Sequence, residues 1–130
     1  MDPSQVNKQT CMCVELDPDF YYLIQSFVER SGLCALHVGQ ASETLHLAKQ
    51  IHPAVICLER NQHTNQRVRD VLNALKSDKE TGPIPIILFS WLDEEDQSSK
   101  IGADVYVKKP VMYVDFIDAL AVVGISHPGP

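Results

Sequence analysis

Short apolar runs alternate with amphipathic stretches along the chain. The runs are nearly continuous and are bounded by polar or turn-forming residues, which predicts buried strands over residues 11–16, 33–38, 54–59, 86–90 and 104–107. Apolar residues recur at helical spacing in the intervening segments, which predicts helices over residues 17–31, 42–51, 68–75, 93–101 and 114–121. Such an alternation of strand and helix is typical of a parallel α/β sheet.

Boundary signals support the first two predicted helices. Asp17 and Pro18 favour a helix start, because proline fits the first turn of a helix. Gly32 favours the end of the same helix, since glycine readily adopts the left-handed conformation that closes it. Ser42 is the predicted N-cap of the second helix.

The pattern predicts one domain of the α/β class. Strands that are apolar on both faces suit a sheet covered by helices on both sides, and right-handed crossovers place the helices there. We therefore expect a (βα)5 doubly wound, five-stranded parallel sheet. A chain of 130 residues is long enough for a single core. The expected division is a polar N-terminal segment over 1–10, a domain over 11–123, and a tail or linker over 124–130.

Composition narrows the classes of partner. The net charge of −6 and the pI near 5.2 argue against nucleic-acid binding by this domain. No apolar segment approaches the roughly 20 residues that span a bilayer, and the N-terminal sequence MDPSQVNKQT lacks the apolar core of a signal peptide. We therefore expect no membrane partner and a cytoplasmic location.

The four cysteines do not have the spacing of a metal site. Cys11, Cys13, Cys34 and Cys57 all lie in apolar runs that predict strands, and the C-x-C pair shares one strand face. A metal site would require a second ligand pair at suitable spacing, and the five histidines are scattered. We interpret the cysteines as buried reduced thiols and expect no metal there.

Candidate chemistry gathers where the predicted strands end. In a doubly wound sheet, the functional crevice lies at the carboxyl ends of the strands. Glu15, Glu59, Ser90 and Lys109 all fall at or just past such ends. Glu59 closes the run PAVICLE, so a carboxylate follows five apolar residues of a buried strand.

Four segments resemble the receiver domain of bacterial response regulators, which has a chemotaxis-regulator-like, flavodoxin-like topology. They are VELDPDF (14–20), PAVICLE (53–59), PIILFS (85–90) and GADVYVKKP (102–110), and the resemblance extends from residue 11 to residue 123. The last segment is the most specific. The resemblance implies a role in two-component, or phosphorelay, signalling.

The resemblance also implies a role for each matching position. Glu59 occupies the phosphoacceptor position, and Glu15 and Leu16 occupy the acidic pair that holds Mg²⁺. Ser90 and Tyr106 match the hydroxyl and aromatic of the switch. The implied pocket lysine is followed by a proline whose peptide bond is a candidate for the cis form, in the pair Lys109 and Pro110.

Several positions depart from the family pattern. Leu16 replaces the direct metal ligand, and the adjacent Asp17 should point elsewhere. Glu59 is one methylene longer than the aspartate of the family. The loop after it lacks the usual Met-Pro and glycine, and the segment from Ser90 to residue 102 is about a helical turn short. Trp91 stands where a small residue usually follows the hydroxyl, so its indole should crowd or cover the pocket.

These departures favour an atypical, phosphorylation-independent pseudo-receiver that acts by protein–protein interaction. Glu59 could mimic the phosphorylated state by pairing with Lys109, or the pair could be purely structural. The alternatives are a working phosphoacceptor that uses Glu59, and a small-ligand sensor in the vacated pocket. No nucleophile–base pair appears at motif spacing, so we do not expect an enzyme. We expect no cofactor, with Mg²⁺ binding weak or absent.

The expected partner is a signalling protein, such as a histidine kinase or an output domain. The contact surface should comprise the predicted helix over 93–101, the strand over 104–107 and the helix over 114–121. Trp91 is the candidate contact residue, because tryptophan is enriched at interface hot spots.

Overall fold

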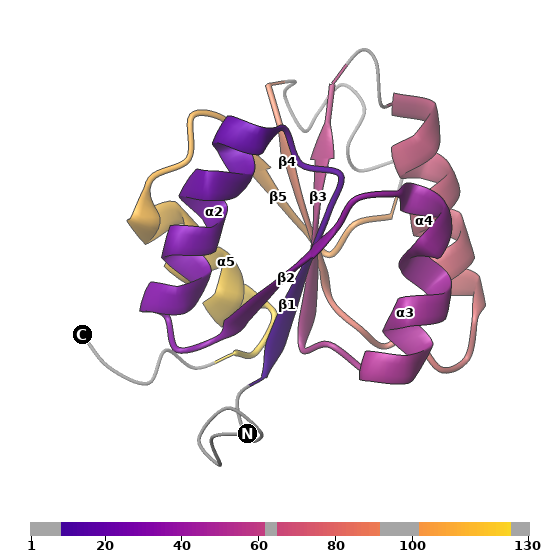
Figure 1. Ribbon diagram of the computed structural model, residues 1–130. Helices are drawn as coiled ribbons and strands as arrows, with labels where there is room; N and C mark the ends of the chain where they lie inside the picture. Colours follow the sequence, from indigo (N-terminus) through magenta and orange to yellow (C-terminus); the bar gives the residue numbers. More distant parts are fainter. Residues whose placement is uncertain (1–8, 62–64, 92–101, 126–130) are drawn as a thin grey trace.

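Five parallel strands form one sheet in a computed structural model of the chain, which describes residues 9–61, 65–91 and 102–125 (Figure 1). The strand order is β2-β1-β3-β4-β5. Every neighbouring pair is parallel, which confirms the predicted sheet. The strands are β1 (Thr10–Val14), β2 (Cys34–Val38), β3 (Val55–Arg60), β4 (Ile86–Ser90) and β5 (Val105–Lys108).

Helices cover both faces of the sheet, so the doubly wound prediction is confirmed. Helices α2 (Pro18–Arg30) and α5 (Tyr113–Val122) lie on one face, and α3 (Thr44–Ile51) and α4 (Asn65–Ser77) lie on the other (Figure 1). The short 3-10 turn η1 (Ala41–Glu43) precedes α3. The helix predicted over 93–101 lies outside the described residues. Within the described ranges, no helix combines the length and apolar character that a membrane span requires.

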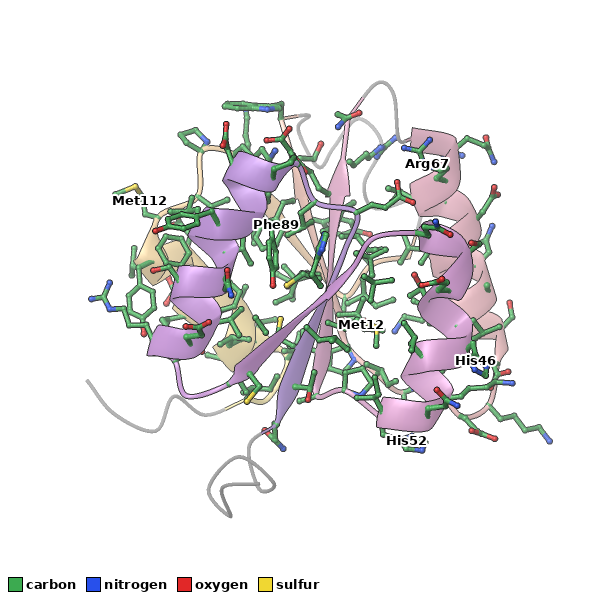
Figure 2. The ribbon with its side chains drawn as sticks, in the orientation of Figure 1. Met12, His46, His52, Arg67, Phe89 and Met112 are labelled. Atoms are coloured by element: carbon green, nitrogen blue, oxygen red, sulfur yellow. The ribbon has the colours of Figure 1, made fainter. Side chains whose placement is uncertain are left out.

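Strand alternation divides the core into two apolar clusters. On β3, Val55 and Cys57 pack under α2 and α5, whereas Ile56 and Leu58 pack under α3 and α4. Figure 2 shows the same division, with Phe89 of β4 beneath α2 and the methionine of β1 on the side of α3 and α4. Glu59, which follows Leu58 on β3, therefore belongs to the α2 and α5 face.

Three predicted boundaries are wrong for identifiable reasons. Strand β1 ends at Val14, because Glu15 adopts the left-handed conformation with φ of 47° and leaves the strand. Ser42 lies inside η1, and Glu43 is the N-cap of α3. Arg60 was predicted to begin a loop, but it is the last residue of β3 and is buried.

Candidate functional site

A buried ion pair joins two strand ends at the carboxyl edge of the sheet. Glu59 is the penultimate residue of β3, and Lys109 follows β5. Lys109 Nζ donates a hydrogen bond to Glu59 Oε2, and only 5% of Glu59 and 9% of Lys109 are exposed. The backbone N–H of Asp17 donates to the other oxygen, Glu59 Oε1, at 2.8 Å. Both carboxylate oxygens of Glu59 are therefore engaged by the protein itself.

Aromatic rings hold the ammonium group of Lys109 in place. Its Nζ lies 4.0 Å from the ring centroid of Phe20 and 5.8 Å from that of Trp91. Such contacts attract a cation to the ring face and favour the lysine rotamer that meets Glu59. The next peptide bond, between Lys109 and Pro110, is cis.

The ion pair lies at the wall of an open cleft of about 480 Å³. Trp91 is 61% exposed and lines this cleft together with the side of α2. Asp17 was predicted to point away from the metal position. It is exposed and lines the cleft, and its backbone N–H donates to Glu59. The other lining residues are Asp19, Phe20, Leu23, Asn61, Lys109, Pro110 and Val111.

The two residues at the acidic-pair positions have partners other than the ion pair. Glu15 turns toward η1 and α4, where its Oε2 accepts a hydrogen bond from the N–H of Ala41 at 2.6 Å. Its Oε1 lies 3.2 Å from the guanidinium of Arg67. Leu16 is only 4% exposed and belongs to the apolar cluster under α2 and α5. The backbone turn at Glu15 produces both placements, because it reverses the strand alternation at this point.

This donor set is a poor fit to a magnesium ion. Mg²⁺ requires hard oxygen ligands in near-octahedral geometry. Leu16 offers no oxygen, Glu15 is held by Arg67 and a backbone N–H, and Glu59 is held by Lys109. An ion would have to displace two protein cations to gain two carboxylates.

The residues at the predicted switch positions lie on the α3 and α4 face of the sheet, opposite to the face that holds the ion pair. Phe89 packs under α2, so the next residue, Ser90, faces α3 and α4 by strand alternation. Tyr106 is half-buried against the apolar cluster of that face. Arg60 pairs in register with Ser90 and lies on the same face. Burial, followed by the nearby charge of Arg69, lowers the pKa of the Arg60 guanidinium.

Sequence reasoning missed three contributors to this edge. Phe20 and Arg67 were not among the predicted site residues, although they contact Lys109 and Glu15. The N–H of Asp17 carries no sequence signal at all. Only the Phe20 position had a detectable clue, since an aromatic one turn into the helix after the acidic positions faces the strand ends.

Three of the four cysteines meet in the core beneath this site. Cys11, Cys13 and Cys57 are buried, and their Sγ atoms all lie within 4.8 Å of one another. Hydrogen bonds from the neighbouring thiols, followed by burial, raise the pKa of Cys57. The thiols are reduced, as interpreted from the sequence, although Cys34 is only half-buried. Their convergence was not predicted, because the third thiol comes from a different strand.

Curated proteins of known class are similar to the chain in sequence. The chain is 28% identical over 101 residues to the polar-differentiation response regulator DivK of Brucella ovis, covering 75% of this chain and 81% of the relative. The DivK protein of Brucella suis matches to the same extent. These relatives are response regulators, which agrees with the resemblance of the strand-end segments to receiver domains. No family model matches the chain.

Solved structures agree with the receiver fold. The chemotaxis response regulator CheY4 of Vibrio cholerae superimposes with a TM-score of 0.78 at 15% identity, covering 90% of this chain and 99% of that chain. The receiver domain of a sensor histidine kinase from Pseudomonas aeruginosa PAO1 gives a TM-score of 0.75 at 16% identity, covering 90% and 98%. The latter structure has a magnesium ion coordinated in its active site cleft.

Proposed function

We propose that this receiver signals by protein contact and is not phosphorylated at Glu59. The observation that carries the proposal is the buried pair of Glu59 and Lys109. A receiver that awaits a phosphoryl group needs an acceptor oxygen that is free to attack. Here the lysine that would pair with a bound phosphoryl group is already paired with the residue at the acceptor position.

Chemistry at Glu59 is unfavourable for two further reasons. In-line attack on phosphorus is sensitive to displacements of about 1 Å, and glutamate places its carboxylate one methylene further out than aspartate. Charge on the transferring phosphoryl group is normally neutralised by Mg²⁺. Leu16 removes one ligand for that ion, and we expect Mg²⁺ to bind weakly or not at all.

The pair would hold the domain in one constant state. A carboxylate carries less charge and fewer acceptor oxygens than a phosphoryl group, so Glu59 would be a partial mimic of the modified acceptor. Its contact with Lys109 does not depend on a donor or on hydrolysis. We therefore propose a pseudo-receiver whose output is fixed by its sequence and controlled by the availability of its partner.

A signalling protein, such as a kinase or an output domain, is the proposed partner. Trp91 lies beside the cleft with its indole largely exposed, and Met112 and Val114 at the start of α5 are exposed apolar side chains. Tryptophan contributes disproportionately to binding energy at interfaces. We propose that this end of the sheet, between α2 and α5, contributes to the contact.

Phosphotransfer is tested directly with a small phosphodonor. We expect the purified chain, incubated with acetyl phosphate and Mg²⁺, to show no gain of one phosphoryl mass by intact-protein mass spectrometry. The physical reason is that both Glu59 oxygens are engaged and Leu16 replaces one metal ligand. The matched variant is Glu59→Gln. A gain in the wild-type chain that disappears in this variant would establish a working phosphoacceptor and overturn the proposal.

A second measurement separates a phosphoryl mimic from a purely structural pair. We expect Glu59→Gln to shift the amide resonances of the cleft and also those of β5 and α5, together with the indole resonance of Trp91. Loss of the charge should change the position of Lys109, which contacts the Trp91 ring and begins the connection to α5. Heteronuclear NMR spectra of both proteins provide the test. Shifts confined to residues that touch Glu59 would show that the pair only satisfies two charges.

A further inference from the structure

Three thiols converge from two neighbouring strands on the α2 and α5 face of the sheet. Cys11 and Cys13 lie two residues apart on the same face of β1. Cys57 of β3 is the register partner of Cys13. The Sγ atoms of Cys11 and Cys57 are 3.5 Å apart, and all three lie within 4.8 Å of one another. None of the three residues is exposed to solvent.

This spacing matches the ligand triangle of a metal ion. A metal–thiolate bond is about 2.3 Å long, so three sulfurs around one ion lie about 4 Å apart in trigonal geometry. The separation of 3.5 Å between Cys11 and Cys57 and the upper limit of 4.8 Å for all three sulfurs are compatible with that value. The strands themselves are fixed by the ladder between β1 and β3.

The number and type of donors select the ion. Among the described residues, the group that could hold a metal here contains these three sulfurs and no histidine or carboxylate. A structural zinc ion takes four protein ligands, and this group offers three. Soft thiolates favour cuprous copper among the common metals, and that ion is satisfied by three sulfurs.

We propose that Cys11, Cys13 and Cys57 form a three-coordinate site for a soft monovalent metal ion, cuprous copper. Each bond from copper to a thiolate replaces an S–H bond and releases one proton to solvent. No electron transfer is involved, because copper enters and remains as Cu(I). The site is distinct from the Glu59 cleft and does not depend on the proposed function.

The position of the site connects it to the rest of the domain. Cys57 and Glu59 lie on the same face of β3, separated by one residue. The same apolar cluster includes Phe27 of α2 and Phe116 of α5. A bound ion would cross-link β1 to β3 beneath these helices. Entry of the ion requires local opening of this layer, which proteins undergo without global unfolding.

The test is anaerobic loading of the whole chain with Cu(I). The metal is supplied as its acetonitrile complex, equilibrated with the protein, and then challenged with the Cu(I) chelator bathocuproine disulfonate. We expect the wild-type chain to retain one copper ion. The Cys57→Ala variant should have an affinity for Cu(I) at least tenfold lower. Cys34→Ala is the matched control. Cys34 precedes Ala35, which packs against this cluster, so by strand alternation Cys34 faces the other side of the sheet. This variant should retain copper like the wild type.

X-ray absorption at the copper edge provides a measurement that does not depend on variants. We expect three sulfur neighbours around copper in the loaded wild-type chain. Circular dichroism establishes that each variant is folded before its retention is compared. The proposal is overturned if the wild type loses all copper to the chelator, if Cys57→Ala retains it equally well, or if nitrogen or oxygen neighbours replace sulfur.

Discussion

Replacing Lys109 by methionine is expected to lower the free energy of unfolding by about 3–5 kcal/mol, the range observed when one partner of a buried ion pair is removed. The methionine retains most of the apolar stem that packs against Phe20, so the change isolates the charge. Glu59 would remain 5% exposed, with its Oε2 deprived of the ammonium donor. Urea denaturation followed by circular dichroism measures the loss.

Two variants test the cause of that loss. Lys108→Met changes the preceding, exposed lysine of β5, and should alter stability by less than about 0.5 kcal/mol. The double variant Glu59→Gln with Lys109→Met removes both charges and should recover much of the stability, because no buried charge is left without its counter-charge. A double variant no more stable than Lys109→Met would contradict the ion-pair explanation.

The fold was largely predictable because its signals are local. Helix α2 begins at Pro18 and ends at Arg30, where Asp17 and Gly32 had indicated its boundaries. Five apolar runs gave five parallel strands, since strand periodicity and crossover handedness leave few alternatives. The boundary at Glu15 failed because a positive φ at a glutamate has no signature in the sequence. The predicted end of β3 before Arg60 was wrong because a charged residue at a strand end normally indicates a loop.

The site was only partly predictable because it depends on register between strands. The receiver resemblance was enough to indicate Glu59 and Lys109, which the structure brings into contact. It could not indicate that Glu15 would pair with Arg67 of α4, since that contact joins elements 52 positions apart in the chain. The meeting of Cys57 with the C-x-C pair of β1 has the same origin. Spacing rules for metal ligands detect neighbours along the chain, not neighbours across a ladder.

Polar groups at the carboxyl edge of the sheet lie on opposite faces. Glu59 and Lys109 lie on the α2 and α5 face, whereas Ser90 and Tyr106 lie on the α3 and α4 face. The backbone N–H of Lys109 donates to the carbonyl of Ser90 at 2.8 Å, so the two faces are joined through main chain at the sheet edge. The ion pair and Ser90 are therefore connected through the main chain of adjacent strand ends.

Reintroducing a carboxylate at the vacated ligand position is expected to fail as a repair. Leu16→Asp should lower the free energy of unfolding by about 3–5 kcal/mol, because it removes a buried leucine side chain and places an acid in an apolar cluster. Leu16→Met is the matched control and should cost less than about 1.5 kcal/mol, since it conserves volume and polarity.

Magnesium distinguishes loss of packing from recovery of a metal site. A ligand that binds only the folded state raises stability in proportion to the logarithm of its concentration. We expect millimolar-range Mg²⁺ to leave the melting temperature of Leu16→Asp unchanged, because Glu59 is already bound by Lys109 and Glu15 by Arg67. Thermal unfolding with and without Mg²⁺ measures this. A rise specific to Leu16→Asp and absent from Leu16→Asn would mean that the leucine alone closes the site, and that the ion pair yields readily to a metal.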